Sequence, residues 1–207
     1  NVMNGLCLSG AAISLYGDSR PASGAEHHMS HYWEVVFEQK GESHAMHGEQ
    51  VAVGTVLVLM LAEELAKTKP DFEKARAFAK AYDEAAWAEE IKRAYGSAAG
   101  EVFEIEAKAK KNDVQKRLER IDSMEKNWDA VVEQLKTLPS ADFLRNLLRD
   151  IGCPATPADI KLDDAILKDT FMYCKEVRPR YTIFQTVYDL GLMDELSNKV
   201  IEACKGV

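Results

Sequence analysis

The chain has 207 residues, 46% of them hydrophobic and 29% charged, which suits one globular domain covering residues 1–207. Its formal net charge of −8 argues against a surface for nucleic acid or for an anionic membrane, because both need clustered Lys and Arg. The cysteines have neither Cys-x-x-Cys spacing nor the density of a disulfide scaffold, which predicts reduced, buried thiols and a cytoplasmic protein: Cys7, Cys153, Cys174 and Cys204.

The first 24 residues predict a helix followed by a loop. The helix runs from Asn1 to Leu15 and ends before a segment with Gly and Pro, Tyr16 to Gly24. Because the sequence opens without Met and without a basic segment, we expect that residues upstream have been removed. Apolar residues of this helix would then be exposed and are candidates for self-association into a homo-oligomer: Leu6, Leu8 and Ile13.

Two further helices are predicted next. The first covers Ala25 to Gln39, with Trp33 on its apolar stripe, and Gly41 is placed to end it. The second runs from His47 to about Ala66. Its longest apolar run, Val51 to Ala62, is shorter than the roughly 20 residues of a membrane-spanning helix. We therefore expect a buried helix and no membrane association.

The remainder of the chain also favours helices, so the predicted fold class is all-α. A helix beginning near Asp71 would bury one face made of Phe72, Ala75, Phe78, Ala79 and Tyr82. The segment from Gly100 to Leu138 predicts one long amphipathic helix, whose charge run we interpret as a solvated face. Shorter helices are expected over residues 141–151, 163–176 and 193–203.

All five histidines lie between positions 27 and 47, and this clustering indicates a site. His27 and His31 are four residues apart, so on a helix they share one face and can direct two imidazoles at one metal ion or one substrate. His28 points elsewhere. His47 stands at the start of the next helix, where it can project into the junction between the two. Spacing alone favours His27 with His31 as ligands, and leaves a pair of His27 and His47 open.

Three segments resemble the sn-glycerol-1-phosphate dehydrogenases. Residues 19–31 read S-R-P-A-S-G-A-E-H-H-M-S-H, residues 47–54 read H-G-E-Q-V-A-V-G, and residues 178–183 read R-P-R-Y-T-I. The first string is specific to that family, whereas H-G-E-x-V-x-x-G is shared across a superfamily with glycerol dehydrogenase, iron-containing alcohol dehydrogenases and dehydroquinate synthase. The resemblance spans nearly the whole chain. It implies the helical C-terminal domain of the dehydroquinate synthase-like superfamily, without its N-terminal α/β nucleotide-binding domain.

By that resemblance, His27 and His47 match the two metal-ligating histidines, and His31 matches a histidine of the substrate site with a catalytic role. The family's third ligand is an acidic residue further toward the N-terminus, in sequence not present here. Arg20 lies where dehydroquinate synthases keep an arginine that contacts the substrate, and its guanidinium suits a phosphate or a carboxylate.

The implied reaction interconverts dihydroxyacetone phosphate and sn-glycerol 1-phosphate with NAD(P). The expected metal is zinc, because two histidines and a carboxylate suit it, although nickel and iron accept similar ligands. His31 would either transfer a proton or orient a ligand. No G-x-G-x-x-G string occurs here, so NAD(P) would bind mainly to the missing nucleotide-binding domain, and this chain alone would be inactive.

Two other interpretations compete with this one. Within the superfamily, the chain could come from a glycerol dehydrogenase or a dehydroquinate synthase-like enzyme. From a different class, it could be a non-catalytic helical interaction module, in which the histidines are ordinary polar groups and the amphipathic segment near Val114 to Val131 docks a partner.

Overall fold

The computed structural model describes residues 2–206 and is all-helical over that range, with no strand, which confirms the predicted fold class. The predicted start of the first helix at Asn1 lies outside the described residues. The α-helices are α1 (Val2–Tyr16), α2 (Ala25–Lys40), α3 (His47–Lys67), α4 (Phe72–Lys80), α5 (Glu84–Tyr95), α6 (Ala99–Ala109), α7 (Val114–Lys136), α8 (Ala141–Asp150), α9 (Asp164–Tyr173), α10 (Ile183–Asp189) and α11 (Met193–Cys204). Short 3₁₀ segments cover η1 (Arg20–Ala22), η2 (Gly96–Ala98), η3 (Pro157–Ile160) and η4 (Cys174–Glu176).

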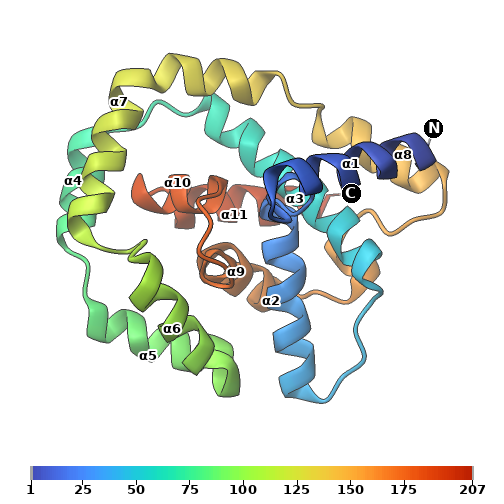
Figure 1. Cartoon of the computed structure of the whole chain (residues 1–207), viewed down its shortest axis with the longest axis horizontal. Coiled ribbons are helices and arrows are strands. Elements are labelled where there is room, and N and C mark those ends of the chain that lie inside the picture. The colour runs from blue at the N-terminus through green and yellow to red at the C-terminus, as the bar shows by residue number, and fades with distance from the viewer. Residues whose placement is uncertain (1, 207) are drawn as a thin grey trace.

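Helix α3 is the centre of the fold. It packs against α2, α7, α8 and α11, and Figure 1 shows it passing between them. Its sequence repeats a large apolar residue every fourth position, which on a helix gives one continuous stripe. The stripe is fully buried and consists of Val53, Leu57, Leu61 and Leu65. Burying each such side chain contributes about 1.5–3 kcal/mol, so α3 is held firmly in place. None of the helices within residues 2–206 combines the length and apolar content needed to cross a bilayer.

The first turn of α2 touches α3 at Gly54. A Cβ atom added to Gly54 would lie 3.0 Å from the backbone oxygen of Glu26 and 3.5 Å from its Cα. A side chain at this position would press on the Glu26 backbone, so glycine favours this close approach. Because Glu26 immediately precedes His27, the close contact at Gly54 sets where the N-terminal turn of α2 lies relative to α3.

The second and third helices expected from the sequence are confirmed as α2 and α3. Gly41 ends α2 in the left-handed conformation with φ 65°, as expected of a helix C-cap. The helix expected from Asp71 is also present as α4, where Asp71 caps it by accepting a hydrogen bond from the Lys74 amide at 3.0 Å. On its predicted buried face Ala75 and Ala79 are indeed buried, but Phe78 is 42% exposed.

The single long helix predicted over Gly100 to Leu138 was wrong. The chain forms α6 and α7 instead, separated by residues 110–113. Lys110 ends α6 with φ 50°, and the Asp113 side chain caps α7 by accepting from the Lys116 amide at 2.9 Å. Local capping by an aspartate therefore outcompetes continuation of the helix. Helices α5 and α10 were not predicted from the sequence. The cysteine prediction was correct only in part, since all four are free but only Cys174 is buried.

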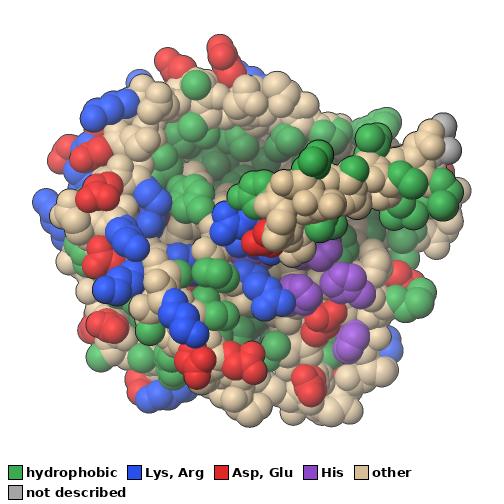
Figure 2. Space-filling view, in the orientation of Figure 1, with side chains coloured by type: hydrophobic (Ala, Val, Ile, Leu, Met, Phe, Trp, Pro, Cys, Tyr) green, Lys and Arg blue, Asp and Glu red, His purple; other side chains and the backbone are tan. Residues whose placement is uncertain are grey.

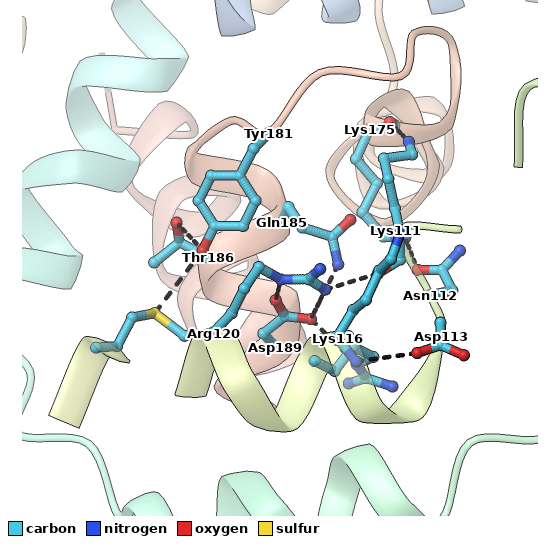
Figure 3. Close-up of polar contacts among 12 residues, drawn as sticks. Lys111, Asn112, Asp113, Lys116, Arg120, Lys175, Tyr181, Gln185, Thr186 and Asp189 are labelled. Atoms are coloured by element: carbon cyan, nitrogen blue, oxygen red, sulfur yellow. Dashed lines mark hydrogen bonds and ion pairs between the residues drawn. The ribbon is translucent and has the colours of Figure 1, made fainter. Parts of the chain in front are cut away.

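A buried polar cluster fixes the loop between α6 and α7 against the C-terminal segment. The ammonium of Lys111 donates to the backbone oxygen of Arg178 at 3.0 Å and lies 3.2 Å from a Glu176 carboxylate oxygen. Asn112 donates to the other Glu176 oxygen at 2.9 Å, and Lys175 pairs with that same carboxylate. Figure 3 shows the side chains of Lys111, Asn112 and Lys175 lying close together. The cluster thereby holds the start of the R-P-R-Y-T-I string in place.

A second cluster of charged side chains fastens α7 to α10. Asp189 accepts from Arg117 Nε at 3.0 Å, and Arg120 reaches both of its carboxylate oxygens (Figure 3). The Arg117 guanidinium is fully buried, and it lies over the Tyr188 ring at 4.7 Å from the centroid. Charges buried without water need such partners, and here they come from two helices that are distant in sequence.

Candidate functional site

Three imidazoles converge where α2 and α3 begin. The ring centroids of His27 and His47 lie 5.3 Å apart, those of His31 and His47 lie 5.7 Å apart, and those of His27 and His31 lie 6.3 Å apart. His27 and His31 stand one turn apart on α2, and His47 is the first residue of α3. The two pairings that spacing left open therefore describe one cluster of three rings. Figure 2 shows histidines gathered on one face, beside Lys and Arg side chains.

Two carboxylates form hydrogen bonds with these three rings. The Glu26 carboxylate lies 2.7 Å from His27 Nδ1, and the same oxygen accepts from the Gly24 amide at 2.8 Å. The Glu34 carboxylate serves the other two rings, with one oxygen 3.0 Å from His31 Nδ1 and the other 3.0 Å from His47 Nδ1. An ionised carboxylate can only accept, so each Nδ1 carries the hydrogen.

The consequence is that the second nitrogen of each ring is left for another partner. Within residues 2–206, every hydrogen bond formed by the rings of His27, His31 and His47 uses Nδ1. Their Nε2 atoms therefore carry a lone pair. A histidine whose Nδ1–H is held by a carboxylate is the arrangement typical of metal-ligating histidines, because it fixes the tautomer and raises the basicity of the free nitrogen.

The charge state of Glu34 agrees with this arrangement. Partial burial would by itself raise the pKa of this carboxyl, but the hydrogen bonds from His31 and His47 outweigh burial and hold the pKa below its ordinary value. Glu34 is therefore an ionised acceptor near neutral pH, as the hydrogen-bond directions require.

A metal ion fits this donor set only in part. The Zn–N distance is about 2.0–2.1 Å, so two ligating nitrogens lie within about 4 Å of each other, whereas the ring centroids of His27 and His47 lie 5.3 Å apart. In the part of the chain that the structure describes, however, no group of three or more His, Cys, Asp or Glu side chains is arranged to hold a metal ion. Imidazole nitrogens are donors that zinc accepts, so the chemistry of His27 and His47 suits this ion, but at least one further ligand is needed.

The remaining two histidines lie outside the cluster. His28 is fully buried in the core, and burial, followed by the charges of Lys111 and Arg180, lowers its pKa to about 3. It is neutral, and both of its ring nitrogens lack a hydrogen-bond partner among residues 2–206. His44 is exposed in the loop before α3. The expectation that His28 points away from its neighbours on α2 is met.

Arg20 is the exposed first residue of η1, beside the end of α1. Its guanidinium is 3.5 Å from an Asp18 carboxylate oxygen and donates to the Tyr16 hydroxyl at 3.3 Å. Those contacts are local, and nothing within residues 2–206 ties Arg20 to the histidine cluster. Its predicted role in substrate binding stays a prediction.

A different arginine braces this loop. Arg180, in the R-P-R-Y-T-I string, donates to the backbone oxygen of Ser23 at 2.8 Å, to Asp18 at 3.0 Å and to the Ser19 hydroxyl at 2.9 Å. It joins two strings that are more than 150 positions apart and holds the segment of chain that leads to His27. Arg178 is exposed, and its side chain forms no hydrogen bond or ion pair with any of residues 2–206.

Sequence reasoning missed the carboxylates and the hydroxyl behind the rings. Glu26 is adjacent to His27, and Glu34 follows His31 by three positions, which is a helical neighbour spacing that could have indicated the second contact. The contact of Glu34 with His47 spans two helices and leaves no local pattern. Ser30, whose hydroxyl lies 3.1 Å from His47 Nδ1, was missed for the same reason.

The fold and the cluster together define an all-helical chain with a carboxylate-oriented histidine site. No family model and no solved structure matches the chain. Among curated proteins, it is 27% identical over 178 residues to the glycerol-1-phosphate dehydrogenase [NAD(P)+] of Halalkalibacterium halodurans, covering 86% of this chain and 35% of that protein. It is 25% identical over 190 residues to the enzyme of the same description from Geobacillus stearothermophilus, covering 91% and 38%. Over a shorter stretch of 63 residues, identity to the one from Archaeoglobus fulgidus reaches 46%, covering 30% of this chain and 17% of that protein.

The chain is therefore homologous to glycerol-1-phosphate dehydrogenases over most of its own length, as its sequence strings indicated. It spans a little more than a third of the length of those first two relatives.

Proposed function

We propose that this chain provides the metal- and substrate-binding region of an NAD(P)-dependent glycerol-1-phosphate dehydrogenase, which interconverts dihydroxyacetone phosphate and sn-glycerol 1-phosphate. The dehydrogenase activity by which these relatives are described supports the reaction class. The observation that carries the proposal is the convergence of His27, His31 and His47, with each Nδ1 bound to a carboxylate and each Nε2 left over.

His27 and His47 are the residues that would hold the metal, for which we favour zinc over nickel or iron. When bound, such an ion supplies a Lewis acid that polarises the substrate carbonyl and stabilises negative charge on its oxygen. Glu26 and Glu34 orient the two rings toward it. This chain contributes two ligands, and the remaining ligand would come from outside its 207 residues.

His31 is the residue to which we assign proton transfer. Its Nδ1–H is held by Glu34, so its Nε2 is the atom that can accept a proton from the substrate hydroxyl in the direction of oxidation and return it in the direction of reduction. An imidazole suits this task because it titrates near neutral pH. The rival role, orientation of a ligand, would leave the proton to water.

The phosphate of the substrate needs a cationic partner, and two arginines are candidates. Arg20 is the one the sequence resemblance suggests. Arg178 has the free guanidinium, and its charge is among those that lower the pKa of His28, the residue next to His27. A planar guanidinium binds phosphate in bidentate fashion. NAD(P) would bind outside these residues, since no G-x-G-x-x-G string occurs in them, so we expect this chain alone not to oxidise NAD(P)H.

Zinc binding tests the proposal against a non-catalytic interaction module. The purified chain and its His27→Ala, His47→Ala and His44→Ala variants are titrated with Zn²⁺ in competition with a chromophoric chelator. We expect His27→Ala and His47→Ala to weaken zinc binding at least about tenfold, and His44→Ala to change it far less, because the exposed His44 ring contacts Gln50 and is not one of the three converging rings. Measurable zinc binding of equal strength in all four proteins would favour the module.

A further inference from the structure

One carboxylate, that of Glu34, is shared by two rings of the cluster. Its Oε2 lies 3.0 Å from His31 Nδ1 and its Oε1 lies 3.0 Å from His47 Nδ1. Glu34 stands one turn after His31 on α2, whereas His47 begins α3, so the carboxylate also joins the two helices. Its side chain is 31% exposed, which leaves it partly shielded from water. None of the three recognised sequence strings includes it.

The two rings differ in how many acceptors they have. His31 Nδ1 has Glu34 as its partner. His47 Nδ1 has Glu34 and also the Ser30 hydroxyl, at 3.1 Å. Within the part of the chain that the structure describes, these are the partners of the two nitrogens.

The directions of the hydrogen bonds around Ser30 follow from the orientation of the Gln50 amide. The Gln50 amide nitrogen donates to the backbone oxygen of Ala45 at 2.9 Å, so the Gln50 amide oxygen faces Ser30. The Ser30 hydroxyl donates to that oxygen at 2.9 Å and therefore accepts from His47. Ser30 and Gln50 are both buried, so water does not replace these bonds. His47 must therefore carry its hydrogen on Nδ1, in agreement with the contact to Glu34.

We propose that Glu34 is a positioning residue that sets the tautomer and orientation of His31 and His47 together, with His31 depending on Glu34 alone and His47 supported by Ser30 as well. The inference rests on the proposed function for its catalytic meaning, since it would couple the proton-transferring ring to a metal-holding ring. The hydrogen-bond arrangement itself is a property of the chain without metal.

Histidine tautomers can be read directly by NMR. The chain is labelled with ¹⁵N at its histidine rings, and two-bond and three-bond ¹H–¹⁵N correlations are recorded without metal at about pH 8.5, well above the ordinary imidazole pKa of about 6.5, so that the rings are neutral. In the unmodified chain we expect the Nδ1–H tautomer at His27, His31 and His47. A dominant Nε2–H tautomer at His31 would overturn the proposal.

Substitutions then separate the two rings. Glu34→Gln keeps the size of the side chain but offers one acceptor oxygen and no charge, so we expect the tautomer ratio of His31 to move toward Nε2–H by at least about tenfold, the factor that one charge-assisted hydrogen bond is worth. His47 should move less, and the double variant Glu34→Gln with Ser30→Ala should release His47 as well. The control is Glu38→Gln, one turn further along α2, where the side chain is exposed.

Each outcome of these substitutions either supports or contradicts the role proposed for Glu34. An unchanged His31 tautomer in a folded Glu34→Gln protein contradicts the proposal, as does an equal change in Glu38→Gln. If Glu34→Gln fails to fold, the tautomers of the unmodified chain decide. Because no metal or substrate is used, these results stand apart from zinc binding: loss of the tautomer effect refutes the role of Glu34, while unchanged zinc binding in His27→Ala and His47→Ala refutes the proposed function.

Discussion

Replacing Gly54 by Ala perturbs the contact that seats the first turn of α2 on α3. The new Cβ would lie 3.0 Å from the backbone oxygen of Glu26, an atom fixed within a helix and unable to move away cheaply. Overpacking of this kind costs about 1–3 kcal/mol, whereas the better helix propensity of Ala returns about 1 kcal/mol. We therefore expect Gly54→Ala to lower the free energy of unfolding by about 1 kcal/mol.

Gly48 provides a matched control on the same helix. A Cβ added there meets nothing within 4 Å, so Gly48→Ala gains helix propensity without a clash and should raise the free energy of unfolding by up to about 1 kcal/mol. The two variants should differ by about 2 kcal/mol, which in a domain of this size is about 4–8 °C in Tm. Urea denaturation and thermal melts followed by circular dichroism measure both. Equal stability of Gly54→Ala and Gly48→Ala would refute the argument that Gly54 is required for close helix contact.

Three further predictions concern stability. Asp113→Ala removes the cap of α7 and should cost about 1 kcal/mol in urea denaturation, whereas no loss would mean that the break after α6 is not held by this cap. Burial is the main cause that lowers the pKa of His28 to about 3, so below about pH 6.5 the unfolded chain binds a proton that the folded chain does not. Stability therefore falls as the pH drops from 6.5 toward 3. His28→Leu should flatten this part of the curve of unfolding free energy against pH. Burial would raise the pKa of Glu176, but Lys175 and Lys111 hold this pKa at about 2. The stabilising effect of Glu176 is therefore present above the ordinary pKa of about 4.5 and is lost as the pH falls toward 2. Glu176→Gln should be less stable at pH 7 and show a shallower acid transition, and an unchanged transition would contradict the ion pair.

The helices that carry the site could be predicted from the sequence because their signals are local. Apolar residues at helical spacing mark α3, and Gly41 marks the end of α2. The break at residues 110–113 escaped prediction because the segment is charged on both sides, and the deciding features are a left-handed Lys110 and an aspartate cap that compete with an otherwise helical pattern. Lysine gives no hint of a left-handed backbone, unlike glycine.

The candidate site divides in the same way. The spacing of His27 and His31 alone predicts that they share a helix face, but the position of His47 beside them depends on how α3 crosses α2. Spacing therefore could not choose between a pair of His27 with His31 and a pair of His27 with His47. Glu34 acts through a residue 13 positions away on another helix. Contacts of this kind depend on tertiary packing, so the rings were recognisable in the sequence while the groups that orient them were not.

Zinc titration of the ¹⁵N-histidine-labelled chain tests most directly whether His27 and His47 face a common point through Nε2. We expect added Zn²⁺ to shift the Nε2 signals of both rings in parallel, with one midpoint. The Nδ1 signals should keep the pattern of a bound hydrogen, and the signals of His28 should stay unchanged. Shifts confined to His44, or separate midpoints for His27 and His47, would contradict it.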